Sequence, residues 1–156
     1  MTTQKITPFL WYDGQAEEAV GLYTSLFKDS KIVSIARYGD EFPEMKGKVL
    51  TAVFELNGQR FMAIDGGPQF KFNESMSFQV SCETQEEIDF LWNSLIADGG
   101  AESQCGWLKD KFGLSWQIIP PILGQLLQDK DPQKAGKVMQ AMLQMRKINI
   151  QQLKDA

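Results

Sequence analysis

The sequence predicts an α+β protein that repeats one unit, a strand followed by a helix and three strands, and then continues in helices. The first observation is an internal repeat, because EEAVGLYTSLF at 17–27 aligns with EEIDFLWNSLI at 86–96, with apolar residues at helical spacing in both. The second is that each helical segment follows an apolar extended run, ITPFLWY at 6–12 or SFQVSCE at 77–83. Glycine-containing turns and further apolar runs follow each helix, which predicts the remaining strands.

Capping residues predict where the two repeated helices begin and end. Asp13 is the predicted N-cap of the first helix. Thr84 and Glu87 form a capping box at the start of the second helix. Gly99 and Gly100 are typical of a helix end and follow the second helix.

Two hairpins are predicted at equivalent places in the halves. Asn57-Gly58 is typical of a two-residue turn in which both residues have positive φ, and it pairs Phe54 with Phe61, Val53 with Met62, and Glu55 with Arg60. In the second half, a turn at Lys111-Phe112 would pair Trp107 with Trp116. Alternation then places aromatic pairs, and Cys105 beside the second pair, on the face that packs against the helices. We interpret CGWLKDKFGLSWQIIP at 105–120 as this hairpin; a reactive Cys105 is the alternative.

The predicted organisation is one domain at 1–120, with modules at 5–65 and 76–120 joined by a linker at 66–75, followed by a helical extension at 121–156. Pro121 lies in the first turn of one helix of the extension, and Asp131 caps the next. Apolar and amide side chains recur along this second helix at Val138, Met139, Met142, Met145 and Asn149. Such a methionine-rich stripe is typical of core or of a subunit contact, and less often of an adaptable binding surface.

Composition excludes several classes of protein. Twenty acidic residues against sixteen Lys and Arg give a net charge of −4 without a basic run, which argues against nucleic acid as a partner. No apolar run is long enough to span a membrane, and the start lacks the layout of a signal peptide, so we expect a cytoplasmic protein. In that compartment Cys82 and Cys105 are expected to be buried free thiols rather than a disulfide.

The chain contains no histidine. Serine–histidine triads, cysteine–histidine pairs and histidine metal sites are therefore excluded within it. Acid–base chemistry would depend on Asp, Glu, Lys, Tyr or Cys.

The repeated unit, closing with D-x-F-G-x-x-W-Q at 110–117, resembles the vicinal oxygen chelate superfamily of glyoxalases, bleomycin-resistance proteins and extradiol dioxygenases, over residues 5–120. DGGPQFKFNESMSFQVSC and DPQKAGKVMQAMLQMRKINI, with the hairpin between them, resemble the PhnB-like family labelled 3-demethylubiquinone-9 3-methyltransferase, through to the C-terminus. Methyl transfer from S-adenosylmethionine usually requires a glycine-rich loop, and no G-x-G-x-G motif occurs here.

The superfamily resemblance implies that the sheet face away from the helices curves into a cup that holds a ligand. Its expected members here are polar Tyr12, Glu55, Arg60 and Gln117, among apolar Leu10, Met62, Phe78 and Val80. Few polar groups among apolar ones are typical of a small-molecule site. Alternatively, Glu55 and Arg60 form only a cross-strand ion pair.

Most enzymes of the superfamily hold a divalent ion with four side chains, two from each half. The equivalent positions fall near Ile6, Met62, Met76 and Gln117, of which only Gln117 offers an oxygen ligand. We therefore expect no metal and no other cofactor.

Three functions are compatible with these patterns. The first is a metal-free binding module for an apolar or aromatic metabolite or drug. The second is an enzyme, a transferase or isomerase, that uses Glu55, Tyr12 or Cys105. The third is an interaction or regulatory protein that acts through the methionine-rich tail. We also expect a homodimer, because Met139, Met142 and Met145 require an apolar cover.

Overall fold

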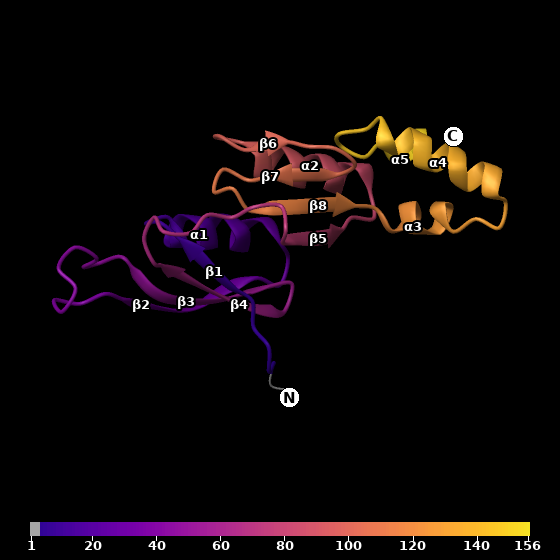
Figure 1. The fold of residues 1–156 in the computed structure, drawn as a ribbon. Helices are drawn as coiled ribbons and strands as arrows, with labels where there is room; N and C mark the ends of the chain where they lie inside the picture. The colour runs from indigo at the N-terminus through magenta and orange to yellow at the C-terminus, as the bar shows by residue number, and fades with distance from the viewer. Residues whose placement is uncertain (1–3) are drawn as a thin grey trace. The chain divides into compact units, whose positions relative to one another are not determined.

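The computed structural model describes residues 4–156, which form two compact units that meet in sequence between Lys71 and Phe72 (Figure 1). Each unit contains a four-stranded sheet with one long helix against it. The predicted α+β fold with a repeated strand-helix-three-strand unit is confirmed.

The first unit follows the predicted order of elements. Its elements are β1 (Phe9–Tyr12), α1 (Ala16–Leu26), β2 (Lys31–Arg37), β3 (Val49–Leu56) and β4 (Gln59–Asp65). The strand order is β1-β4-β3-β2, with β1 parallel to β4 and the other neighbours antiparallel.

The second unit repeats this topology with shorter strands and adds helices. Its elements are β5 (Ser77–Ser81), α2 (Gln85–Ile96), β6 (Ala101–Glu102), β7 (Trp107–Lys109), β8 (Ser115–Ile119), α3 (Pro121–Leu127), α4 (Pro132–Leu143) and α5 (Ile150–Lys154). The strand order is β5-β8-β7-β6, again with one parallel pair, β5 and β8. Between residues 4 and 156, no helix combines the length and the apolar character that crossing a membrane requires.

One face of each sheet packs against its helix and forms the core of that unit. In the first unit Phe54 and Phe61 stack with ring centroids 5.6 Å apart, as predicted from the Asn57-Gly58 turn. Both turn residues have positive φ, 51° and 79°. In the second unit, fully buried Trp92 belongs to α2 and fully buried Ile118 to β8. The other side of each sheet is called its open face below.

A buried carboxylate ties three elements of the first unit together. Asp65, at the end of β4, accepts hydrogen bonds from the backbone N–H of Ala16 at 2.9 Å and of Val49 at 3.1 Å. The predicted N-cap, Asp13, is therefore wrong: Gln15 occupies that position without a side-chain bond, and Asp65 satisfies the first helical amide instead. The start of α1 is therefore capped by a residue that is distant in sequence, rather than by a residue next to the helix.

The other predicted helix starts are confirmed. Thr84 accepts a hydrogen bond from the backbone N–H of Glu87, and the Glu87 carboxylate accepts one from the backbone N–H of Glu83. Asp131 caps α4 by accepting from the backbone N–H of Gln133.

The predicted register of the second hairpin is wrong by one residue. Trp107 lies opposite Gln117, and Leu108 lies opposite Trp116. The loop has three residues, 111–113, rather than two, because Gly113 adopts a φ of 90° and the Asp110 carboxylate accepts from the backbone N–H of Phe112 and Leu114. The shift moves Trp107 to the open face and leaves Trp116 in the core.

The helical extension has its own small core, built from Leu123, Val138, Met145, Ile148 and Leu153. Met142 packs against this cluster, whereas Met139 is 42% exposed. The predicted stripe is interrupted, because α4 ends at Leu143 and Asn149 caps α5. Two of the three methionines are therefore covered by the chain itself.

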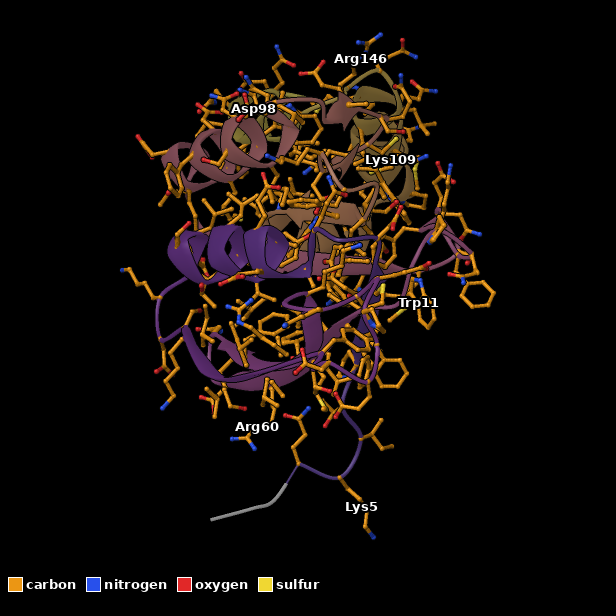
Figure 2. All side chains as sticks on the ribbon, turned by 90° about the vertical axis from the view of Figure 1, so that its left-hand side faces the viewer. Lys5, Trp11, Arg60, Asp98, Lys109 and Arg146 are labelled. Atoms are coloured by element: carbon orange, nitrogen blue, oxygen red, sulfur yellow. The ribbon has the colours of Figure 1, made fainter. Side chains whose placement is uncertain are left out.

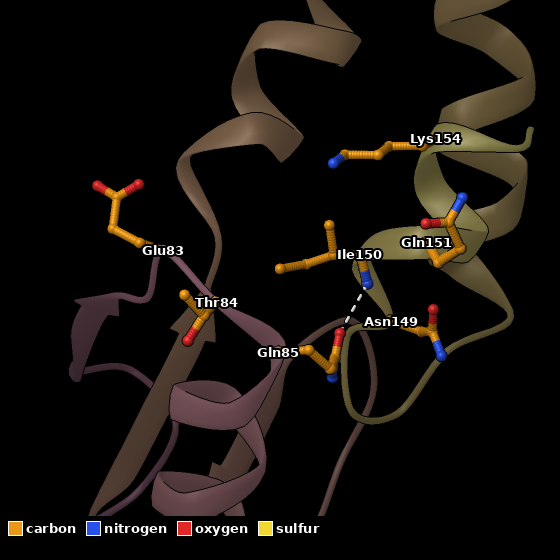
Figure 3. Close-up of a pocket in the computed structure, with 7 residues that line it drawn as sticks. All are labelled: Glu83, Thr84, Gln85, Asn149, Ile150, Gln151 and Lys154. Atoms are coloured by element: carbon orange, nitrogen blue, oxygen red, sulfur yellow. Dashed lines mark hydrogen bonds between the residues drawn. The ribbon is translucent and has the colours of Figure 1, made fainter.

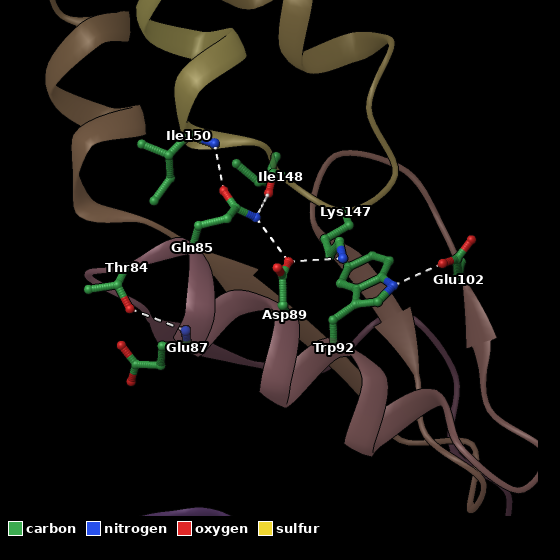
Figure 4. A network of polar contacts seen from close by, with 9 residues as sticks. All are labelled: Thr84, Gln85, Glu87, Asp89, Trp92, Glu102, Lys147, Ile148 and Ile150. Atoms are coloured by element: carbon green, nitrogen blue, oxygen red, sulfur yellow. Dashed lines mark hydrogen bonds and ion pairs between the residues drawn. The ribbon is translucent and has the colours of Figure 1, made fainter.

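Backbone contacts attach the extension to the rest of its unit (Figure 4). The Gln85 side chain donates to the carbonyl of Ile148 at 3.0 Å and accepts from the N–H of Ile150 at 2.9 Å. The N–H groups of Cys105 and Gly106 donate to the carbonyls of Met145 and Arg146.

The two cysteines are free thiols, but only Cys82 lies where it was expected. Burial, with a smaller contribution from the Glu87 charge, raises the pKa of Cys82 to about 12, so this thiol stays neutral. Cys105 is only partly buried and lies in the loop before β7, with a φ of 58°, rather than in a strand. Its predicted place beside a core pair of tryptophans is wrong for the same reason as the hairpin register.

We predict that Asp65→Ala lowers the free energy of unfolding by about 2–4 kcal/mol, because two buried amides lose their acceptor. Asp13→Ala is the matched control and should change it by less than about 0.5 kcal/mol. Urea denaturation followed by circular dichroism measures both. Equal losses in the two variants would contradict the assigned role of Asp65.

Candidate functional site

The open face of the first sheet is mainly apolar and aromatic. Strand alternation places Phe9, Trp11, Met62 and Ile64 on this side. The Trp11 ring meets Phe70 edge to face with centroids 5.0 Å apart, and its Nε1 donates to the carbonyl of Gly67 at 2.9 Å. Gly66 lies against the Trp11 ring so closely that no β-carbon would fit there. Trp11 is therefore held in one orientation.

Glu55 and Arg60 lie opposite each other on the same open face, near the Asn57-Gly58 turn. Arg60 is labelled in Figure 2. Arg60 donates to Glu55 at 3.2 Å, and their side chains are 49% and 21% exposed respectively. A pair of this exposure contributes little to stability. It places both charges at one end of the apolar surface.

The open face of the second sheet is polar by contrast. Gln117 donates from Nε2 to the Ser77 hydroxyl at 2.8 Å, and its Oε1 accepts a longer bond from Gln79 at 3.5 Å. These bonds fix which end of the Gln117 amide points toward Ser77. Trp107 lies directly opposite Gln117 and is partly buried.

Lys109, which is labelled in Figure 2, and Ser115 form the next cross-strand pair of this polar face. The Lys109 ammonium is ion-paired with Glu74, in the segment that leads into β5. The hydrogen bond from Lys109 lowers the pKa of the Glu74 carboxyl. Glu74 therefore stays ionised at neutral pH, and the two charges offset each other.

Two predicted site residues lie on the faces that the helices cover. Tyr12 is 3% exposed and its hydroxyl is hydrogen-bonded to the Tyr23 hydroxyl of α1 at 3.2 Å. Phe78 lies beside Trp116, with ring centroids 5.4 Å apart. The expected faces of Tyr12 and Phe78, and of Leu10 and Val80 by the same alternation, are therefore corrected. Glu55, Arg60, Met62 and Gln117 do lie on open faces.

Sequence reasoning missed the polar neighbours of Gln117. The parallel pairing of β5 and β8 places Gln79 beside Gln117 and Ser77 beside Ser115. Counting in steps of two from Gln117 leads to Ser115, so the alternation carried this signal. Ser77 and Gln79 were missed because Phe78 and Val80 of the same strand were expected on this face.

The residues at the metal positions of the superfamily do not fit a divalent ion. Ile6 and Met76 are exposed, Met62 offers a thioether, and the Gln117 amide is bonded to neighbouring side chains. Over residues 4–156, no group of three or more His, Cys, Asp or Glu side chains is placed to hold a metal.

A separate surface pocket of about 360 Å³ lies between the start of α2 and α5 (Figure 3). Its lining residues are Glu83, Thr84, Gln85, Asn149, Ile150, Gln151 and Lys154. Gln85, part of this lining, binds the backbone of the extension. None of the predicted site residues lines the pocket.

Comparisons with known proteins agree with this architecture. The family model described as 3-demethylubiquinone-9 3-methyltransferase matches residues 4–119. A putative 3-demethylubiquinone-9 3-methyltransferase, PhnB protein, from Bacillus cereus is 47% identical, with a TM-score of 0.71, and the match covers 75% of this chain and 99% of that one. No match was found among curated proteins.

More distant solved structures share the fold. Protein PA1353 from Pseudomonas aeruginosa is 21% identical with a TM-score of 0.64, over 76% of this chain and 98% of that one. The fosfomycin resistance protein FosX from Listeria monocytogenes, complexed with Mn(II) and sulfate, is 14% identical with a TM-score of 0.50, over 74% and 90%.

The family match ends before α3, so the expected resemblance through to the C-terminus is not supported by it, and the extension lies outside the matched region. The matched region nevertheless contains both sheets and both open faces. The chain therefore belongs to the 3-demethylubiquinone-9 3-methyltransferase, or PhnB-like, family.

Proposed function

We propose that the chain is a metal-independent binding protein for a small apolar or aromatic molecule, held on the open face of a sheet. The observation that carries the proposal is the Gln117 amide, fixed by Ser77 and Gln79 on a sheet face away from α2. A neutral, oriented amide can recognise a polar group of a ligand without a metal.

The open face of the first unit, taken by itself, also has the composition of a small-molecule surface. Trp11 and Met62 provide apolar surface, and Glu55 and Arg60 provide charge at its edge. Tyr12 and Phe78 would support the two open faces from the helix side rather than touch the ligand. Superfamily relatives with a resistance function and this fold support a role in binding small molecules.

An enzyme is the second candidate, because the family description names a methyl transfer. The chain itself supports this less well. It has no G-x-G-x-G loop for S-adenosylmethionine, and its sheets are mixed rather than doubly wound and parallel. Cys105 and Tyr12, the nucleophile and acid or base considered for such a reaction, are a loop residue and a core residue.

A thermal-shift screen against metabolites tests binding. A ligand at a hundred times its Kd stabilises the folded state by about 2.7 kcal/mol, which raises Tm by roughly 5–10 °C for a chain of this size. Gln117→Ala should remove at least half of the shift, and Gln133→Ala on exposed α4 is the matched control. A ligand recovered unchanged supports binding, whereas conversion to a product would favour the enzyme.

Elemental analysis of protein purified without chelator tests the metal-independent character. We expect less than about 0.1 equivalent of zinc, nickel, iron or manganese, because the four positions offer one amide oxygen and two thioethers. Addition of chelator should leave the thermal shift of any ligand unchanged. Near-stoichiometric metal that is lost in Gln117→Ala would overturn this part of the proposal.

We also propose a homodimer, supported by the exposed apolar residues Met139 (42%) and Leu143 (53%), one turn apart on α4. Light scattering at micromolar concentration should give twice the mass of one chain. The double variant Met139→Lys with Leu143→Lys should give a single chain, whereas Gln140→Lys on the same helix should not. A monomeric wild-type protein would refute the dimer.

A further inference from the structure

Ser115 has a buried hydroxyl that the fold does not use. The residue is 1% exposed, and its Oγ has no hydrogen-bond partner among residues 4–156. A buried polar atom without a partner costs about 1–3 kcal/mol, and folded proteins rarely retain one. It is the one side-chain atom of this kind in the described part of the chain.

Strand geometry places this hydroxyl on the open face of the second sheet. Trp116, the next residue, packs on the helix side against Phe78, so Ser115 points the other way, as Gln117 does. Ser115 lies between Ser77 on β5 and Lys109 on β7. Both of these neighbours are engaged, Ser77 with Gln117 and Lys109 with Glu74, whereas Ser115 is not.

The ion pair of the residue opposite Ser115 opens readily. Lys109 lies directly across from Ser115, and its ion pair with Glu74 joins side chains that are 41% and 61% exposed. Exposed pairs of this kind contribute about 0–1 kcal/mol. The Lys109 side chain can therefore move aside for a ligand at small cost.

Trp107 provides an aromatic surface at a distance from Ser115 that suits a small ligand. It is one strand across from Gln117 and therefore two residues along and one strand across from Ser115. With about 3.3 Å per residue and about 4.8 Å between strands, the two α-carbons are roughly 8 Å apart. One six-membered ring against Trp107 with one short substituent spans that distance.

We infer that Ser115 anchors the ligand, its hydroxyl donating a hydrogen bond to an oxygen substituent of a single aromatic ring that packs against Trp107. The class of ligand is a monocyclic aryl ketone or benzylic alcohol. This inference rests on the proposed binding function and narrows it. The free energy that the unpaired Ser115 hydroxyl costs in the free protein is recovered on binding, because the ligand oxygen accepts the missing hydrogen bond.

Stability measurements on free protein give the first test. Ser115→Ala should melt at the wild-type temperature or above, because it removes a buried polar atom that has no partner. Ser81→Ala, an exposed serine at the far end of the same face, is the matched control. A loss of about 3 °C or more in Ser115→Ala relative to Ser81→Ala would show that the hydroxyl is bonded within the fold, and would overturn the inference.

Titrations followed by nuclear magnetic resonance give the second test, with acetophenone and ethylbenzene as probes. The two molecules are close in size and differ in the carbonyl oxygen. Wild-type protein and Ser81→Ala should bind acetophenone about 3–10-fold more tightly than ethylbenzene, with shifts at the amides of Ser115 and Gln117. Ser115→Ala should bind both equally.

Two results would overturn the inference. If Ser115→Ala keeps the wild-type preference for acetophenone, Ser115 is not the anchor, although the binding function stands. If neither probe shifts the amides of the second sheet in wild-type protein, the ligand class is wrong. Failure of the proposed function itself appears separately, as the absence of any stabilising compound in the metabolite screen.

Discussion

Each sheet of this protein packs one face against a helix. This constraint determines which side chains form the core and which form the candidate binding surface. Side chains of a strand alternate between faces, so each residue that packs against a helix fixes its two neighbours on the open side. Trp116 in the core places Ser115 and Gln117 on the open face. In the first unit, Ala63 in the core does the same for Met62 and Ile64.

Buried aspartates fix the strand ends from which side chains alternate between the two faces of each sheet. Asp65 closes β4 and holds the first amides of α1 and β3, so three elements of the first unit have a common origin. Asp110 closes β7 and binds the backbone of the loop together with Nε1 of Trp116 at 3.0 Å. Each half thus uses one carboxylate, at a different place, to join elements by charge-assisted bonds to N–H groups.

The sequence was sufficient for features whose causes are local or repeated. The Asn57-Gly58 turn fixed the first hairpin, and the Thr84 capping box fixed the start of α2. The sequence was insufficient where a side chain outside the recognised capping and turn positions bonds to the backbone and determines the local structure. Asp65 caps α1 from 49 residues away in sequence, and the side chain of Asp110 lengthens the second turn by one residue.

That single residue had consequences for the candidate site. It exchanged Trp107 between faces. Ser77 and Gln79 were missed for a separate reason: the parallel pairing with β8 places them, rather than Phe78 and Val80, on the open face. Gln117 was placed on the open side despite this, because its position relative to Trp116 does not depend on the turn. Faces that follow from the Asn57-Gly58 turn were predictable. Faces that depend on the second hairpin, or on the parallel pairing of β1 with β4 and of β5 with β8, were not.

The attachment of the extension has an evolutionary consequence. Gln85, inside the region that matches the family, recognises the extension at Ile148 and Ile150 through backbone atoms alone. Backbone groups are the same in every sequence, so side chains of the extension can diverge without loss of this contact. A relative without the extension would leave at this site a neutral amide that water can solvate, not a stranded charge. The contact with Gln85 therefore sets no requirement on the side chains of Ile148 and Ile150, so it can persist while the sequence of the extension changes between lineages.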